Sequence, residues 1–190
     1  PNQMKAYTFS ATANDHVFTR MNSSGDYVKV IHLYAPNGTL LAISPTGMYG
    51  PPWGILDVHL PDTGTYTLLV GDGDADHTGT YNLYIQRTNN PGSPVPIAFG
   101  ETATGTLSKS TEYDTYTFSA MAGDQIYDRM RIDLIHGYAE IRLYAPNGTL
   151  LADDGTAMVC EQRLRLPDTG TYTLLVGDMD DNDVGTYTLY

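Results

Sequence analysis

The sequence predicts an all-β protein of two tandem antiparallel β-sandwich modules, of the jelly-roll or immunoglobulin-like kind, joined by a short Pro/Gly linker. Three observations support this prediction. Two long phrases occur twice in the same order. Apolar and polar residues alternate in short segments rich in Thr and Tyr, which favour strands, and no segment shows the 3.6-residue apolar period of a helix. Turn signals recur at short intervals, which is typical of a sandwich.

The repeated phrases mark two copies of one structural unit. LYAPNGTLLA occupies residues 33–42 and 143–152, and LPDTGTYTLLVGD occupies residues 60–72 and 166–178. Shorter phrases also recur in the same order. YTFSA occurs in both copies, HVFTRM of the first copy corresponds to QIYDRM of the second, and GTYNLY corresponds to GTYTLY. Such a repeat indicates that each copy forms its own supersecondary unit.

The module boundaries follow from the repeat. We expect the first module at residues 1–88, a semi-extended linker at 89–100 and the second module at 101–190. A candidate strand, Glu101–Leu107, opens the second copy, whereas the first copy has only Pro1–Ala6 in that place. The first module should therefore lack its opening strand and present an open sheet edge, which upstream sequence or another molecule is expected to fill.

The strand segments show their two faces in the sequence. In GTYTLLVG of the second copy, Tyr172, Leu174 and Val176 fall on one face, because side chains alternate across a strand. In EQRLRL, Leu164 and Leu166 alternate with arginines in the same way. Each segment therefore predicts one apolar face turned toward a core.

Two kinds of turn separate these strands. Asn37-Gly38 and Asn147-Gly148 predict hairpins closed by type I′ turns, whose two central residues both need positive φ angles. LPDTG predicts a second turn in each copy, because Pro presets φ and Gly ends the turn.

The composition excludes several classes of function. The formal net charge is −12, so no nucleic-acid partner is expected, because phosphate binding needs a basic face. No apolar run approaches the ~20 residues that span a bilayer, so we expect no membrane insertion. The single cysteine, Cys160, cannot form an internal disulfide and is expected to be a small strand residue. Scarce Lys with frequent Thr and Tyr favours an extracellular or cell-surface protein of a prokaryote.

The second copy also resembles the bacterial pre-peptidase C-terminal domain, and most of residues 5–86 follow the same pattern. The motifs that carry the resemblance are Gly105-Thr106-Leu107, Asp114-Thr115-Tyr116-Thr117-Phe118, Ala122-Gly123-Asp124, Ile141 to Gly148, Gly170-Thr171-Tyr172 and Gly185-Thr186-Tyr187. The resemblance implies a secreted, non-catalytic β-sandwich that accompanies proteases and other exported proteins. That family is similar in design to the collagen-binding domains of bacterial collagenases.

Acidic side chains gather in the hairpin before the last strand of each copy. The candidate metal ligands are Asp72, Asp74 and Asp76 in the first copy and Asp178, Asp180 and Asp183 in the second. Closely spaced carboxylates can converge on a hard cation, so Ca²⁺ is the candidate cofactor. Neither cluster is an EF-hand loop. Its sixth residue is His77 or Asp183 where an EF-hand has Gly, and its twelfth is Leu83 or Leu189 where an EF-hand has Glu. The alternative interpretation is a solvated acidic hairpin tip.

No residue pattern indicates catalysis, and the chain is not expected to be an enzyme. The sequence contains no GxSxG elbow and no HExxH or HxH arrangement, and its glycines mark turns rather than a phosphate-binding loop.

Three sequons predict N-glycosylation at Asn22, Asn37 and Asn147, although turn chemistry alone also explains the last two.

Two functions remain open from the sequence. The first is a structural subunit of a surface fibre, filament or stalk, in which copies of the chain join head to tail by strand donation. The second is an accessory module of a secreted hydrolase that binds polysaccharide or an extracellular protein. Aromatic side chains would carry that contact, and the candidates are Tyr49, Trp53, Tyr138 and Tyr144.

Overall fold

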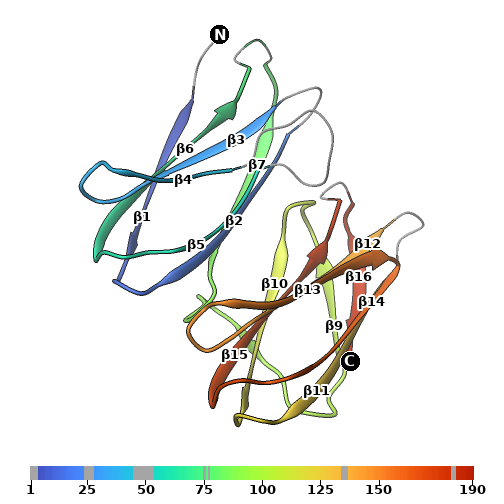
Figure 1. Cartoon of the computed structure of the whole chain (residues 1–190). Coiled ribbons are helices and arrows are strands. Elements are labelled where there is room, and N and C mark those ends of the chain that lie inside the picture. Colours follow the sequence, from blue (N-terminus) through green and yellow to red (C-terminus); the bar gives the residue numbers. More distant parts are fainter. Residues whose placement is uncertain are drawn as a thin grey trace. The chain divides into compact units, whose positions relative to one another are not determined.

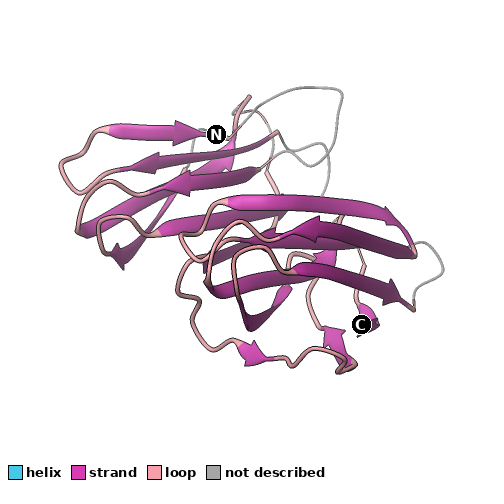
Figure 2. Ribbon diagram, turned by 60° about the horizontal axis from the view of Figure 1, so that its bottom comes forward, coloured by secondary structure: helices cyan, strands magenta, loops and turns pink. Residues whose placement is uncertain are grey.

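The computed structural model describes residues 4–23, 28–44, 54–74, 76, 78–133, 137–180 and 183–190. These residues form strands, turns and loops, which confirms the predicted all-β class (Figures 1 and 2). No helix in the described ranges is long and apolar enough to cross a membrane. The chain divides into two compact units, residues 1–86 and 87–190.

The first unit is a sandwich of two antiparallel sheets. Its strands in the described ranges are β1 (Lys5–Ala11), β2 (His16–Ser23), β3 (Lys29–Tyr34), β4 (Leu40–Ile43), β5 (Ile55–His59), β6 (Gly64–Asp72) and β7 (Tyr81–Arg87). One sheet has the order β1-β6-β3-β4 and the other β5-β2-β7. Between them lies an apolar core that includes Val17 and Met21 from β2 and Ile31 and Leu33 from β3.

The second unit repeats this plan and adds two strands. Its strands in the described ranges are β8 (Val95–Pro96), β9 (Ala103–Leu107), β10 (Tyr113–Ala120), β11 (Gln125–Ile132), β12 (Tyr138–Tyr144), β13 (Leu150–Ala157), β14 (Val159–Arg165), β15 (Gly170–Asp178) and β16 (Gly185–Leu189). The sheets have the orders β13-β12-β15-β10-β8 and β14-β11-β16-β9. The alternation predicted for GTYTLLVG is confirmed, because Tyr172, Leu174 and Val176 all lie in the core.

The residues predicted as a linker belong to the second unit. Val95 and Pro96 pair in parallel with Tyr116 and Thr117 of β10, and Ile97 packs against the core. The division between the units therefore falls at residues 86/87, earlier than the sequence indicates, because β8 extends the five-stranded sheet.

The LYAPNGTLLA hairpins close with a different turn from the one predicted. Gly38 has a φ of 85° and Gly148 a φ of 88°, but neither Asn37 nor Asn147 has a positive φ, so a type I′ turn is wrong. The backbone N–H of Gly38 donates to the carbonyl of Ala35, and Gly148 repeats this bond in the second unit. Only the Gly takes the left-handed conformation, as in a type I turn followed by a Gly bulge.

A pair of tyrosines shows how the two units differ at one end of the sandwich. The Tyr116 and Tyr187 hydroxyls lie 2.8 Å apart and both side chains are buried. The Tyr187 ring lies over Gly105 of β9, where an added Cβ would clash with it. The equivalent hydroxyls of Tyr7 and Tyr81 lie 2.7 Å apart, but Tyr7 is 39 % exposed. In the described part of the first unit, no strand takes the place of β9, and β7 is an edge strand.

Candidate functional site

The outer face of the β14-β11-β16-β9 sheet is the most distinctive surface of the second unit. Side chains alternate strictly across β11: Met130 and Ile132 enter the core, while Tyr127, Arg129 and Arg131 point away from it and are exposed. β14 alternates in the same way. Its outward residues are Glu161, Arg163 and Arg165, with Thr188 and Tyr190 at the neighbouring positions of β16 and just beyond it. We call this surface the Arg/Tyr face.

The Arg/Tyr face concentrates positive charge on an acidic chain. It holds Arg129, Arg131, Arg163 and Arg165, which are four of the ten Lys and Arg residues of a chain whose net charge is −12. Glu161 is the acidic residue within the face, and Asp133 lies at the end of β11, where it pairs with Arg131 at 3.1 Å. The face is therefore basic, and an anionic ligand would be attracted to it.

Cation–π contacts orient two of these arginines. The guanidinium carbon of Arg163 lies 4.6 Å from the ring centroid of Tyr127, and that of Arg129 lies 5.8 Å from the ring centroid of Tyr190. The Tyr127 hydroxyl donates a 2.7 Å hydrogen bond to Glu161, which raises the pKa of the phenol above its usual value. These contacts hold the guanidinium groups in place on the sheet surface.

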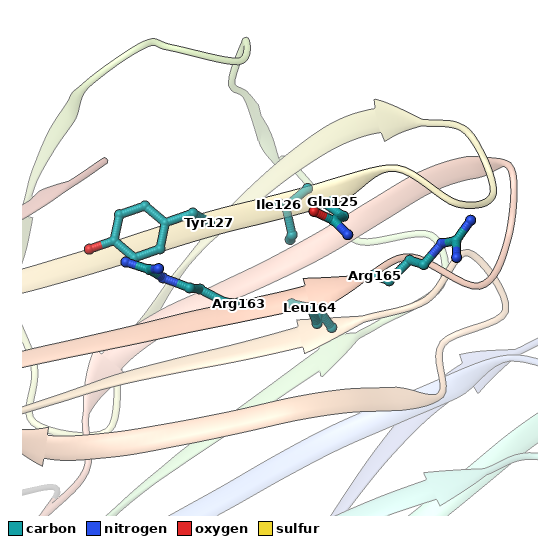
Figure 3. A pocket seen from close by; sticks show the side chains of 6 residues that line it. All are labelled: Gln125, Ile126, Tyr127, Arg163, Leu164 and Arg165. Atoms are coloured by element: carbon teal, nitrogen blue, oxygen red, sulfur yellow. The ribbon is translucent and has the colours of Figure 1, made fainter.

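An open groove runs along the β11–β14 pair on this face. It has a volume of about 630 Å³ and is lined by Gln125, Ile126, Tyr127, Arg163, Leu164 and Arg165. Figure 3 shows Arg163 reaching to the Tyr127 ring at one end, with Gln125 and Arg165 toward the other end. Guanidinium, amide and phenol groups therefore line one continuous groove.

The first unit does not repeat this chemistry. HVFTRM aligns with QIYDRM, which places His16 at the position of Gln125, Phe18 at that of Tyr127 and Arg20 at that of Arg129. On β5, Asp57 and His59 lie opposite Phe18 and His16, so carboxylate and imidazole replace the two arginines of β14. Burial lowers the pKa of His16, although nearby Asp57 opposes this shift. The Arg/Tyr face thus belongs to the second unit alone in the described part of the chain.

Sequence reasoning missed this face, although its signal is present. EQRLRL shows arginines at alternate positions opposite leucines, and QIYDRMRI shows Tyr and Arg with the same period. What the sequence could not show is that the two segments pair. In the structure Tyr127 lies opposite Arg163 and Arg129 opposite Glu161.

The predicted binding residues fall in several places. Tyr49 and Trp53 lie outside the described residues. Tyr138 is 38 % exposed at the start of β12. Tyr144 as an exposed contact is wrong, because its side chain is fully buried and its hydroxyl accepts a 3.0 Å hydrogen bond from Nε of Arg142.

Arg142 lies at the centre of a cluster of buried charges that the sequence did not indicate. Its guanidinium donates to Glu140 at 3.2 Å and to Asp153 at 2.8 Å, and Tyr113 donates a short hydrogen bond to Glu140. Burial opposes the charge of Arg142, but its phenol and carboxylate neighbours raise its pKa above the usual range. The cluster is a compensated set of ions, which makes it a structural feature of β12 and β13.

The first aspartate of each predicted calcium cluster holds the backbone together. Asp72 accepts a hydrogen bond from the N–H of Val28, and Asp178 accepts one from the N–H of Tyr138. Their second carboxylate oxygens accept from the N–H groups of Asp76 and Asp183. Among the described residues, no three His, Cys, Asp or Glu side chains converge on a possible metal position. Calcium binding stays a prediction.

The three sequon asparagines and Cys160 have clear positions. Asn37 and Asn147 are exposed in their turns, where each side chain accepts a hydrogen bond from the N–H two residues further on. Asn22 accepts a hydrogen bond from the Asn82 amide, and glycosylation of all three stays a prediction. Cys160 is buried on β14 as expected of a small strand residue, and burial raises the pKa of its thiol to about 12.

Comparisons with known proteins complete this description. No protein-family model and no curated protein matches the chain. The chain is similar to the pre-peptidase C-terminal domain of a collagenase from Bacillus anthracis, at 23% identity over 53% of this chain and 95% of that one, with a TM-score of 0.42. It is similar to a periplasmic inhibitor of g-type lysozyme from Aeromonas hydrophila, at 23% identity over 51% of this chain and 92% of that one, with a TM-score of 0.38. A structure of carbohydrate-binding modules from the β-sandwich superfamily matches at 12% identity over 100% of this chain and 97% of that one, with a TM-score of 0.29. The first of these is the kind of domain that the second copy resembles in sequence.

Proposed function

We propose that this chain is a non-catalytic extracellular binding module that holds an acidic polysaccharide against the Arg/Tyr face. The observation that carries the proposal is the alignment of four exposed arginines and two exposed tyrosines on one sheet face of a strongly acidic chain. Guanidinium groups bind carboxylate and sulfate through paired N–H donors, so they suit a polymer with an anionic group on each unit.

The composition of the face favours a sugar polymer over an acidic protein. Protein interfaces bury an apolar centre, whereas the outward positions of β11 and β14 carry Gln, Tyr, Arg and Glu, with the half-buried Val159 at one end. The groove offers amide, phenol and guanidinium groups, which can bond both to sugar hydroxyls and to uronate carboxylates. Tyr127 and Tyr190 present half of their surface to solvent, where a pyranose ring can stack.

Calorimetry with polygalacturonate tests the proposal, with dextran as the neutral polymer. We expect saturable binding of polygalacturonate that weakens with added salt, and no binding of dextran. Arg163→Ala and Arg129→Ala should each weaken binding about 5-fold, which corresponds to about 1 kcal/mol. Lys109→Ala is the matched control, because it removes one positive charge from an exposed turn away from the face.

Two results would overturn this function. Polygalacturonate that fails to bind, or arginine variants that bind it as tightly as the Lys109→Ala control, would remove the Arg/Tyr face from the argument. Arginine-dependent binding of polyglutamate without binding of polygalacturonate would replace the polysaccharide with an acidic protein.

The open edge of β7 supports a second function, assembly of copies by strand pairing. In the described part of the first unit, β7 pairs with β2 on one side and with no strand on the other. Tyr7 on β1 and Ile85 on β7 are 39 % and 38 % exposed. An added strand would extend the β5-β2-β7 sheet next to β7, as β9 extends the other unit's sheet next to β16.

A peptide with the sequence of Glu101–Leu107 tests strand pairing. Added to the full chain, it should slow hydrogen exchange of the β7 amides, and a Thr104→Pro version of the peptide should not. The chain itself should sediment as concentration-dependent oligomers. A chain that stays monomeric, with β7 exchange unaffected by the peptide, would exclude this function.

A further inference from the structure

The four arginines of the Arg/Tyr face form a regular line along the paired strands β11 and β14. Four successive outward levels of this pair each hold one arginine and one other residue: Arg165 opposite Gln125, Arg163 opposite Tyr127, Arg129 opposite Glu161 and Arg131 opposite Val159. Neighbouring levels are two residues apart, which is about 7 Å along a strand. The four levels therefore span roughly 20 Å of the sheet, with one arginine at each. We call this line the arginine ladder.

The ladder changes strands at its centre. Its first two arginines lie on β14 and its last two on β11, so no two of them are directly opposite one another. Like charges directly opposite each other on a sheet are destabilising, and this stagger avoids that cost. The residues between the levels, among them Asp128 and Gln162, are buried and point inward, so the ladder occupies the outer face of the sheet.

Each arginine of the ladder is held by a different neighbour. Arg165 donates from Nε to the carbonyl of Gly123 at 3.1 Å, and Arg131 pairs with Asp133 at 3.1 Å. The two central arginines lie over tyrosine rings. A guanidinium has five N–H donors in a planar fork, so one such contact leaves donors for an anion. The four side chains are therefore exposed, oriented and still able to bind.

The first unit has no counterpart of the ladder in its described residues. The corresponding levels of β2 and β5 pair His16 with His59, Phe18 with Asp57, and Arg20 with Ile55. Arg20 is the arginine among these six residues, and it is fully buried. The shared fold therefore does not by itself produce a ladder; the outward residues of β11 and β14 do.

We propose that the arginine ladder binds a long, linear polyuronate side-on, with the polymer running along β11 and β14 and one carboxylate on each of the four arginines. The ligand is the acidic polysaccharide of the proposed function, on which this assignment rests, and the ladder sets its length and direction. Guanidinium pairs with carboxylate through two parallel N–H donors, so each level takes one anionic group.

The length of the ligand follows from the number of levels. A uronate dimer carries two carboxylates and fills two levels at most. Each further unit of the same chain binds as part of an already bound molecule, so it adds affinity at a lower entropic cost. The ladder therefore recognises the interior of an extended chain, and short fragments bind it weakly.

Calorimetry with oligogalacturonates of defined length tests the ladder. If each arginine contributes about 5-fold, the two additional arginines should make octagalacturonate bind the full chain about 25-fold more tightly than digalacturonate. The salt dependence of the affinity should also be steeper for the octamer, because it forms more ion pairs.

A variant of the two end arginines separates length recognition from binding itself. Arg131→Ala/Arg165→Ala should bind the octamer about 25-fold more weakly than the parent does. It should bind the dimer within about 3-fold of the parent, because the two central arginines remain. Arg131→Lys/Arg165→Lys keeps both charges and should bind the octamer more tightly than the alanine pair.

Lys5→Ala/Lys109→Ala is the matched control, because it removes two exposed positive charges that lie outside the ladder. It should bind both oligomers as the parent does. All of these variants change exposed side chains, so the fold should be retained by circular dichroism.

Three results would overturn the ladder. The end-arginine variant could bind the octamer as tightly as the parent, the parent could bind dimer and octamer equally, or the lysine control could lose as much affinity as the end-arginine variant. If Arg163→Ala still weakens polygalacturonate binding in any of these cases, the proposed function stands without the ladder. Polygalacturonate that does not bind the parent overturns both.

Discussion

The guanidinium of Arg163 lies over the ring of Tyr127 at 4.6 Å, and the hydroxyl of the same ring is bonded to Glu161. Three side chains from two paired strands therefore fix one another on the outer surface of a sheet. This arrangement orients a cation before any ligand arrives, which lowers the entropy that binding must remove. It also makes the contact measurable in the free protein.

A double-mutant cycle should detect the contact between Arg163 and Tyr127. Tyr127→Leu and Arg163→Gln should show a coupling of about 0.5–1 kcal/mol in chemical denaturation, the range of exposed cation–π pairs. The matched cycle combines Tyr127→Leu with Arg165→Gln, because Arg165 lies two residues further along β14 and donates to Gly123 instead. Equal coupling in both cycles would mean that general charge, and not the stacked geometry, holds Arg163.

Asp128 should make the stability of the second unit depend on pH. Burial raises its pKa to about 7 from a usual value near 3.8; a hydrogen bond with the backbone of Gln162 opposes this shift and the charge of Asp154 adds to it. The folded state then keeps a proton that the unfolded state releases between about pH 4 and pH 7. Stability from this residue is therefore present at low pH and is lost as pH rises toward 7.

Asp128→Asn should remove that loss. At pH 8 the variant should be more stable than the parent by an amount on the order of 2–4 kcal/mol, and near pH 4 the two should differ little. The free energy of unfolding is measured by chemical denaturation at pH 4 and pH 8, with hydrogen exchange of the β11 and β14 amides reporting on the second unit. Other titrating groups near the carboxylate are Asp154, Glu101, Cys160, Tyr127 and Tyr190, and they are common to both proteins. A variant that is less stable at pH 8 would contradict the assignment.

Asp178 should stabilise the fold through its backbone contacts. The side chain is fully buried and accepts N–H groups from Tyr138 and Asp183, so Asp178→Ala should lower the free energy of unfolding by about 1–3 kcal/mol. Asp180→Ala, on the exposed part of the same hairpin, should change it by less than about 0.5 kcal/mol. The same two variants test the calcium prediction: if Asp180 is a ligand, millimolar calcium should stabilise the parent and not Asp180→Ala.

Tyr172 and Tyr66 should act as equivalent anchors of the LPDTG turns. The Tyr172 hydroxyl donates to the carbonyl of Asp168 and accepts from its N–H, and Tyr66 makes the same two bonds with Asp62. Replacing either buried Tyr by Phe should cost about 1–2 kcal/mol. Hydrogen exchange of the β6 amides measures the stability of the first unit, and exchange of the β15 amides measures that of the second.

Tyr7→Phe is the control for these anchors. Its hydroxyl bond to Tyr81 is exposed to solvent, so its loss should cost less than about 0.5 kcal/mol. A cost equal to that of Tyr66→Phe would show that exposure does not decide the value of these bonds.

Local chemistry explains what sequence reasoning predicted well. Strand segments, their inward faces and the positions of turns depend on neighbours within a few residues, so the period of GTYTLLVG was sufficient to place Tyr172 and Val176 in a core. The turn type was wrong because Asn-Gly is compatible with several hairpins. In the structure the glycine of each pair takes a positive φ and the asparagine does not.

The binding surface could not be predicted in the same way. Arg163 and Tyr127 lie 36 positions apart in the numbering, and only the pairing of β11 with β14 brings them together. Tyr144 shows the opposite error. An outward position on β12 suggested exposure, but Arg142 and its charged neighbours share that face, and the ring is buried.

The sequence by itself determined that this protein is a repeated β-sandwich. The strand period and the turn residues are local properties, and both are present in the sequence of each copy. The tertiary structure alone decided which surfaces carry function. Tyr7 and Tyr116 occupy the same place in the repeat, yet one is exposed and the other buried, because β9 covers the second and no described strand covers the first. Exposure and satisfaction of hydrogen bonds depend on neighbours distant in the chain, and these neighbours come together only when the sheets form.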